Sequence, residues 1–245
     1  MKGVILAGGL GTRLIPLTKV TNKHLLPVYD QPMITYPIRT LVNAGIEDVL
    51  LVTGGNSVGD FVRLLGNGRE YGLRWLSYAY QEGAGGIADA LRLAREYAEG
   101  DKIIVMLGDN IIEGNIRAAA EDFANRESGA RIFLKEVENP REYGVAVCDG
   151  DKVVHIEEKP EHPRSNLAVI GIYMYDAKVF EIIDSLEPSR RGELEITDVN
   201  NVYIDRGEMT YEILQGWWGD SGECIDALYR VSALVAETGA NKMSL

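Results

Sequence analysis

Three short apolar runs in the first half of the chain constrain its fold more than any other feature. They are rich in Val, Ile and Leu, and they span Val4–Ala7, Val49–Thr53 and Ile103–Leu107. Helix-like stretches lie between them, at about 34–44, 58–65 and 87–98, and in the last of these the apolar residues fall on one helix face. Uniformly apolar strands that alternate with helices predict an α/β domain with a mostly parallel sheet covered on both faces.

The second half of the chain follows a different pattern. Strand-like runs are expected at about 131–137, 144–158 and 167–176, and "DGD" at 149–151 predicts a tight hairpin. Helices are expected at about 177–185, 196–206 and 224–238. We therefore predict one domain over 1–245, with a nucleotide-binding half at about 1–130, a more antiparallel half at about 131–222, and a C-terminal helix in 223–245.

Composition excludes several classes of partner. A formal net charge of −12 argues against nucleic acid, because binding a polymer of phosphates needs a clustered basic surface. No apolar run approaches the ~20 residues of a membrane span, and "GVILA" is too short for the core of a signal peptide. Two cysteines without CxxC or metal-type spacing suit a reducing compartment. We expect a cytoplasmic protein without nucleic-acid or membrane partners.

A glycine-rich segment, "LAGGLGTRL" at 6–14, directly follows the first apolar run. It is neither a dinucleotide-binding fingerprint, because Leu14 stands at the third glycine position, nor a Walker A loop, because no G-K-[S/T] follows. Backbone N–H groups of such a turn can wrap an anion, and Arg13 and Lys23 add cations that a turn does not need. The segment favours a polyphosphate site; a glycine turn without chemical meaning is the alternative.

Two aspartates are candidate metal ligands. Asp109 in "LGDN" ends an apolar run, and Asp220 in "WWGDSG" is flanked by glycines. Mg²⁺ binds through one or two carboxylates together with substrate phosphates. Each aspartate could instead form an Asx-turn or a helix N-cap. In "IEEKP", strand alternation places Glu157 and Glu158 on opposite faces, so one of them can enter a site.

No nucleophile arrangement stands out in the sequence. The three histidines have no zinc-type spacing, and no serine lies in a G-x-S-x-G elbow. Phosphoryl-type transfer depends on positioning and charge neutralisation more than on a protein nucleophile, so this absence is consistent with it.

Several motifs in order resemble the sugar-phosphate nucleotidylyltransferase family, most closely its members that use dTTP and glucose 1-phosphate. They are "LAGGLGTRLIPLT", "NKHLLPVYDQPMI", "LGDN", "YGV", "EEKP" and "RGELEITD", and the resemblance runs from Met1 to about Gly222. It implies a Rossmann-like mixed sheet with a smaller antiparallel sugar-binding lobe at about 131–222. It also implies a Mg²⁺-dependent nucleotidyltransferase that makes dTDP-glucose and pyrophosphate from dTTP and glucose 1-phosphate.

The resemblance also implies roles for residues of the first half. Arg13 resembles the arginine that stabilises the leaving pyrophosphate, Lys23 a lysine that reaches the phosphates, and Asp109 and Asp220 the Mg²⁺ carboxylates; Arg13, Lys23 and Asp109 form the expected catalytic set. The expected nucleotide-binding residues are Leu6, Gly8, Gly9, Gly11, Thr12, Gln81 and Gly86, of which the last two would read the base.

On the sugar side, the resemblance implies a hexose pocket and contacts to the sugar's phosphate. The pocket residues would be Tyr143, Gly144, Glu158 and Val169, and the phosphate contacts Lys159 and Arg191. Three positions depart from the family pattern: Ile15 replaces a common aromatic residue, His24 a common Gln, and Gly219 a bulkier residue.

The resemblance further implies a homo-oligomer, a dimer or a tetramer. In longer members, helices past the last motif contribute an allosteric nucleotide-sugar site and tetramer contacts; this sequence ends at Leu245 and lacks them. Feedback regulation of that kind is therefore not predicted here.

Three alternatives stay open at this point. The first is the same chemistry with UTP or another sugar 1-phosphate, since one methyl group discriminates by only ~10–200-fold. The second, from a different class, is a non-catalytic nucleotide-sugar sensor. The third is an NAD-dependent oxidoreductase, which Leu14 already disfavours.

Overall fold

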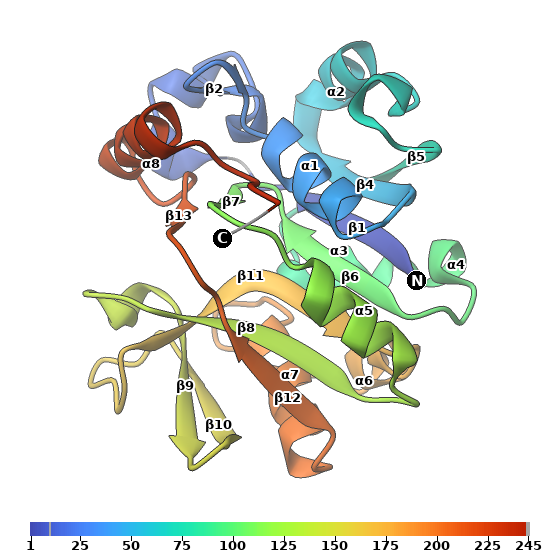
Figure 1. Ribbon diagram of the computed structural model, residues 1–245, viewed down its shortest axis with the longest axis vertical. Coiled ribbons are helices and arrows are strands. Elements are labelled where there is room, and N and C mark those ends of the chain that lie inside the picture. The colour runs from blue at the N-terminus through green and yellow to red at the C-terminus, as the bar shows by residue number, and fades with distance from the viewer. Residues whose placement is uncertain (10, 244–245) are drawn as a thin grey trace.

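A computed structural model describes residues 1–9 and 11–243, so the last two positions of the predicted C-terminal segment lie outside it. Figure 1 labels the elements. The larger sheet contains β1 (Lys2–Ala7), β4 (Asp48–Gly54), β5 (Trp75–Gln81), β6 (Ile103–Leu107), β8 (Ala130–Glu136), β9 (Gly144–Asp149), β10 (Lys152–Glu158), β11 (Leu167–Tyr175) and β12 (Met209–Ile213). Two short pairs are β2 (Pro27–Val28) with β3 (Gln31–Pro32), and β7 (Asn110–Ile112) with β13 (Trp218–Asp220).

The helices flank this sheet or connect its strands. They are α1 (Thr35–Asn43), α2 (Val58–Leu65), α3 (Ile87–Arg92), α4 (Arg95–Ala98), α5 (Arg117–Asn125), α6 (Val179–Asp184), α7 (Ile196–Asp205) and α8 (Ile225–Thr238). Among the described residues, no helix is long and apolar enough to cross a membrane.

The sheet combines a parallel half with a mixed half. Strands β6, β1, β4 and β5 lie side by side and run parallel, with β1 paired to both β4 and β6. β11 pairs antiparallel with β8 along one edge, and its other edge pairs antiparallel with β6 at Ile172–Tyr175 and with β9 at Ala168 and Val169. β11 is therefore the strand shared by both halves, and its register with β8 shifts between Val169 and Tyr173. This is the mixed α/β architecture expected from the sequence, although the second half is not purely antiparallel, because β12 pairs parallel with β8.

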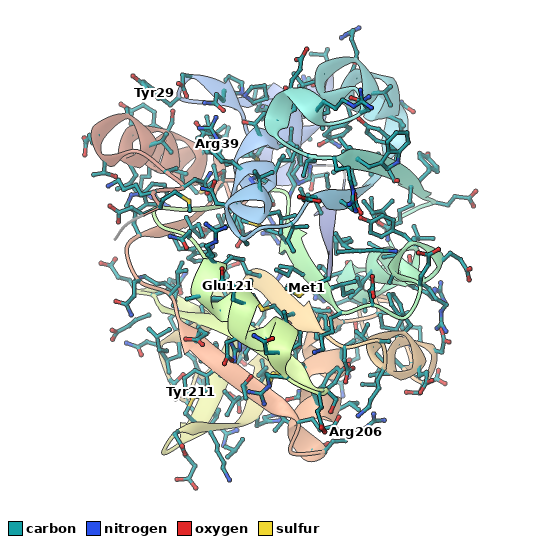
Figure 2. All side chains as sticks on the ribbon, turned by 45° about the vertical axis from the view of Figure 1, so that its right-hand side comes forward. Met1, Tyr29, Arg39, Glu121, Arg206 and Tyr211 are labelled. Carbon is teal, nitrogen blue, oxygen red and sulfur yellow. The ribbon has the colours of Figure 1, made fainter. Side chains whose placement is uncertain are left out.

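Both faces of the sheet are buried. Along β1, Val4 and Leu6 belong to one apolar cluster and Ile5 and Ala7 to the other, as the two-residue strand period requires. A third, smaller cluster joins α8 to β2 and to Leu14 of the glycine-rich segment. Figure 1 shows α8, β13 and β2 gathered at one end of the molecule, with β9, β10 and β12 at the other. In Figure 2, Tyr29 lies beside α8 and Tyr211 and Arg206 lie toward the opposite end.

Most predicted elements form at the expected places. The 149–151 hairpin is present, with Asp149 paired to Lys152 and Gly150 at a φ of 60° in the turn between them. The single helix expected at 87–98 is wrong: α3 and α4 are separate. Leu93 and Ala94 bond to carbonyls three residues earlier, which tightens the chain into a turn and ends the regular α-helical pattern.

Candidate active site

Three strand ends form the first cavity of the site. The loops after β1, β5 and β6 meet at the carboxyl edge of the parallel strands, where open α/β sheets bind ligands. They enclose a cavity of about 240 Å³. Its lining includes the predicted residues Leu6, Gly8, Gly9, Lys23, Gln81, Gly86 and Asp109. The structure thus brings together residues that are far apart in the sequence: Leu6 and Asp109 are separated by 103 positions.

The glycine-rich loop owes its shape to two left-handed residues. Gly9 has a φ of 91° and Gly11 a φ of 62°, conformations that glycine adopts without strain. The carbonyl of Gly11 accepts hydrogen bonds from the Leu14 N–H and from the Thr18 hydroxyl. Gly11 and the exposed Thr12 are not among the residues that line this cavity, nor do they line the second cavity described below. Gly11 therefore shapes the turn in this structure, whereas Gly8 and Gly9 face the cavity.

Lys23 and Asp109 form the central ion pair of the site. The Lys23 ammonium donates to Asp109 Oδ2 at 2.5 Å, and both side chains are largely buried. Burial opposes the charge on each group, but the attraction between them overrides it. The pKa of Lys23 is therefore raised, and that of Asp109 is held well below its usual range. Both groups stay charged at neutral pH.

Strand pairing brings the second aspartate to the first. β13 runs antiparallel to β7, with Asp220 opposite Asn110. The Ser221 N–H donates to the backbone carbonyl of Asp109 at 2.9 Å, and the Gly222 N–H donates to Asp220 Oδ1 at 2.9 Å. Burial, and then the neighbouring Asp109 carboxylate, raise the pKa of Asp220. The carboxylates of Asp220 and Asp109 are therefore close enough to repel each other, and the ammonium of Lys23 is bonded to Asp109.

This donor set fits Mg²⁺. Hard oxygen ligands from one or two carboxylates, completed by substrate phosphates and water, are what the ion uses in phosphate-processing sites. Burial and the repulsion from Asp109 raise the pKa of Asp220, and a cation bound to both carboxylates would oppose both effects. A side chain at Gly222 would crowd this place, since a Cβ there would lie 2.3 Å from Asp109 Oδ2.

The two predicted base-reading residues lie in one wall of the first cavity. The Gln81 amide donates to the carboxylate of Asp89 at 3.0 Å and to the Gly86 carbonyl at 3.3 Å. These bonds engage the side-chain nitrogen of Gln81. Its side-chain oxygen lies beside Gly8, since a Cβ added to Gly8 would be 2.9 Å from it. The Gly85–Gly86 loop is in turn bonded to the Leu194 backbone. Asp89 is a supporting residue that sequence reasoning missed.

A second cavity, of about 260 Å³, adjoins the first. Ile87, Leu107 and Glu193 line both of them. All six residues expected on the sugar side line the second cavity: Tyr143, Gly144, Glu158, Lys159, Val169 and Arg191. Arg13 and Asp220 line it as well, whereas Lys23 and Asp109 line the first cavity.

Carboxylates largely neutralise Arg191. Its guanidinium bonds to Glu195 at 2.8 Å and to Glu158 at 3.2 Å, and Glu193 lies 3.6 Å away. Its side chain is therefore held in place, and its charge is shared before any phosphate arrives. Lys159 differs, since it has a left-handed φ of 42°, which is strained for a residue with a side chain. Strain of this kind is concentrated at functional sites.

The side chain of Asn110 forms three hydrogen bonds in the site. The sequence assigned it no role. Its Oδ1 accepts hydrogen bonds from the Gly171 N–H at 2.9 Å and from the Trp218 indole at 2.7 Å. Its amide donates to Asp109 Oδ1 at 3.1 Å. Asn110 therefore orients the carboxylate of Asp109, and its place beside Asp109 in "LGDN" was the only signal for it.

His24 is buried next to the ion pair. Burial, and then the charge of Lys23, lower its pKa to about 3, so the ring is neutral. Its Nδ1 lies 2.8 Å from Asn22 Oδ1, and a side chain at Gly108 would meet the ring at 2.7 Å. His24 therefore packs the loop of Lys23 against the end of β6.

A family model described as nucleotidyl transferase matches residues 2–238. The chain belongs to the nucleotidyl transferase family. A glucose-1-phosphate thymidylyltransferase of Actinoplanes sp. is 44% identical over 234 residues, which cover 94% of this chain and 77% of the relative. One of Xanthomonas campestris pv. campestris is 46% identical over 90% of this chain and 76% of the relative.

Solved structures agree with this membership. A structure described as a glucose-1-phosphate thymidylyltransferase from Bacillus anthracis, in complex with sucrose, has a TM-score of 0.92 and 48% identity. The match covers 97% of this chain and 96% of that one. A UDP-glucose pyrophosphorylase in complex with UDP-glucose has a TM-score of 0.84 at 24% identity, with 96% and 98% covered, and shows the shared fold alone.

The packing of this nucleotidyl transferase explains one departure from the family pattern. A Cβ at Gly219 would lie 2.3 Å from a methyl group of Val231 in α8. Helix α8 therefore packs against β13 more closely than a bulkier residue would allow. The aspartate next in the chain keeps its place opposite Asn110.

Proposed function

We propose that this nucleotidyl transferase makes dTDP-glucose and pyrophosphate from dTTP and glucose 1-phosphate, with Mg²⁺ as cofactor. The observation that carries the proposal is the junction of the two cavities. Asp109 and Lys23 pair with each other and line the first cavity, and Asp220 and Arg13 line the second. Relatives named glucose-1-phosphate thymidylyltransferase, 44–46% identical over at least 90% of the chain, support this choice of substrates.

The reaction needs no protein nucleophile and no general base. A phosphate oxygen of glucose 1-phosphate attacks the α-phosphorus of dTTP, and the bond from that phosphorus to the bridging oxygen breaks. Pyrophosphate leaves with the electron pair, and the acceptor oxygen is already anionic, so no proton has to be removed. What the protein supplies is positioning and compensation of negative charge.

Each cation has a part in that compensation. The Gly8–Gly9 backbone and Lys23 hold the triphosphate in the first cavity, with Gly11 and Thr12 shaping the loop. Arg13 stabilises the charge that develops on the pyrophosphate. Lys159, supported by Arg191, binds the phosphate of the sugar. Mg²⁺, held by Asp109 and Asp220, would neutralise phosphate charge when bound.

We assign the two organic parts of the substrates to the walls of the two cavities. Gln81 and the Gly86 backbone read the base, and Leu6 also lines the first cavity. Tyr143, Gly144, Glu158 and Val169 form the hexose pocket. We further propose a homo-oligomer that works in the cytoplasm, where the thiols of Cys148 and Cys224 remain free.

A panel of nucleoside triphosphates and sugar 1-phosphates, followed by pyrophosphate release, tests the proposal. We expect the highest kcat/KM with dTTP and glucose 1-phosphate, a ~10–200-fold lower value with UTP, and no turnover once Mg²⁺ is chelated. A higher kcat/KM with UTP or with another sugar 1-phosphate would mean that this pair, and not dTTP with glucose 1-phosphate, is the preferred substrate pair. Binding of dTDP-glucose without pyrophosphate release from any pair would make the protein a sensor.

A further inference from the structure

We infer that Glu223 is a positioning residue for the sugar, acting through the phenol of Tyr143. The inference rests on the proposed function, because it concerns the pocket assigned to the hexose. Glu223 does not line that cavity. It lines a groove of about 540 Å³ on the other side of the same wall, which Tyr143, Trp218 and Asp220 share with the hexose cavity.

Two contacts hold the ring of Tyr143 in this wall. Its hydroxyl donates to Glu223 Oε2 at 2.8 Å, and its ring meets that of Trp218 edge to face, with centroids 5.4 Å apart at 69°. Tyr143 immediately precedes β9, whereas Glu223 lies two residues before α8. The hydrogen bond therefore joins segments 80 residues apart and ties the sugar half to the C-terminal helix.

The direction of this hydrogen bond decides what Tyr143 can offer a ligand. A phenol hydroxyl has one hydrogen to donate, and Tyr143 donates it to Glu223. Burial, and then the bond to Glu223, raise the pKa of Tyr143, so the phenol stays protonated and keeps donating. The oxygen keeps lone pairs that can accept a hydrogen bond, and Tyr143 itself lines the hexose cavity. A sugar hydroxyl can donate to that oxygen, whereas a phosphate dianion has nothing to donate.

The wall is also connected to the catalytic carboxylate. Tyr143 packs on Trp218, the Trp218 indole donates to Asn110, and the Asn110 amide donates to Asp109. A ring of Tyr143 that is free to turn would loosen the packing of Trp218. Glu223 therefore fixes the orientation of the Tyr143 ring from outside the hexose cavity. The contacts of that ring continue through Trp218 and Asn110 to Asp109.

Steady-state kinetics with four variants tests the inference. In Glu223→Ala we expect the KM for glucose 1-phosphate to rise about tenfold, the loss of one hydrogen bond to a charged group, with kcat and the KM for dTTP within about twofold. Tyr143→Phe gives at least this rise, because it also removes the oxygen that accepts from the sugar. The double variant adds nothing to Tyr143→Phe, because the bond to Glu223 is already lost. Glu223→Gln keeps an acceptor and stays within about threefold of the wild type.

The matched control is Glu138→Ala, which removes an exposed acid of the same groove that has no bond to Tyr143. It leaves both KM values unchanged. An unchanged KM for glucose 1-phosphate in Glu223→Ala overturns the inference, as does a Glu223→Gln variant as weak as Glu223→Ala. So does a Glu223→Ala variant in which Tm falls and both KM values rise together, since that marks a structural role. Wild-type turnover is measured first: its absence overturns the proposed function itself, whereas the outcomes above bear on Glu223 alone.

Discussion

Among the cations that line the two cavities, Arg13 and Lys159 have no carboxylate within ion-pair distance among the described residues. Lys23 is paired with Asp109, and Arg191 is surrounded by three glutamates. A cation without a partner can meet an anionic ligand without first giving up an ion pair. Arg13 is also exposed, so it contributes little to packing.

Replacing Arg13 should therefore separate catalysis from stability. In Arg13→Ala we expect kcat to fall about 100-fold, the cost of losing one preorganised group that stabilises developing charge. Because no described ion pair is lost, Tm should move by no more than about 2 °C. Turnover and thermal unfolding are measured on the same preparation.

Arg63→Ala is the matched control, because Arg63 is exposed on α2 and pairs only with Asp60 among the described residues. It should leave kcat and Tm unchanged. Full turnover in Arg13→Ala would remove the arginine from the catalytic assignment and leave the glycine turn without its cation.

Side-chain partners were the part of the site that could not be predicted from local pattern. The glycine-rich segment indicated a phosphate site, and "LGDN" indicated a carboxylate at a strand end. Nothing local, however, pairs Lys23 with Asp109 across 86 residues. Likewise, no sequence pattern indicates that Arg191 forms ion pairs with three glutamates. Such contacts depend on how loops from different strands close, which is a tertiary property.

At the scale of elements, long apolar runs were predictable and very short strands were not. β6 and α2 lie at the predicted bounds, because uniform burial or one-sided periodicity specifies them. β7 and β13, three residues each, exist because they pair with each other, and this pairing places Asp220 opposite Asn110. The break between α3 and α4 interrupts a stretch whose apolar spacing continues through it.

The loop from β5 to α3 offers a test at this scale. Gly86 has a φ of 97°, and a Cβ there would lie 2.6 Å from the Leu194 carbonyl oxygen. Gly86→Ala should therefore lower the free energy of unfolding by about 3 kcal/mol or more, through strain and a backbone clash together. Denaturant unfolding measures the change.

Gly100→Ala is the control, because Gly100 has a φ of 83° but no atom within 4 Å of the added Cβ. It should cost about 1 kcal/mol, the strain alone. Equal losses in the two variants would mean that the contact between the loop and Leu194 contributes nothing to folding.

For the whole molecule, β11 is the strand that makes one site from two halves. It pairs with β6 of the parallel sheet and with β8 and β9 of the antiparallel part. Val169, Gly171 and Tyr173 of β11 line the second cavity. The alternation of strands and helices predicted the first half, and the hairpin signal the second. Their junction depends on β11 pairing with both β6 and β9, which no sequence period encodes.

This arrangement has a chemical consequence. In the proposed function the donor and acceptor occupy adjoining cavities, and the acceptor oxygen would approach the α-phosphorus opposite the leaving pyrophosphate. No cysteine lines either cavity, and the one histidine among the lining residues, His24, is neutral, buried and engaged with Asn22. We therefore predict a single in-line displacement, with no covalent nucleotidyl-enzyme.

The stereochemistry at the α-phosphorus measures this most directly. With one pure diastereomer of dTTP carrying sulfur on the α-phosphate, turnover with glucose 1-phosphate is followed by phosphorus NMR of the dTDP-glucose product. A single displacement inverts the configuration at phosphorus, and inversion is the result we predict. Retention would require two displacements through a group on the protein, and it would contradict direct transfer between the two cavities.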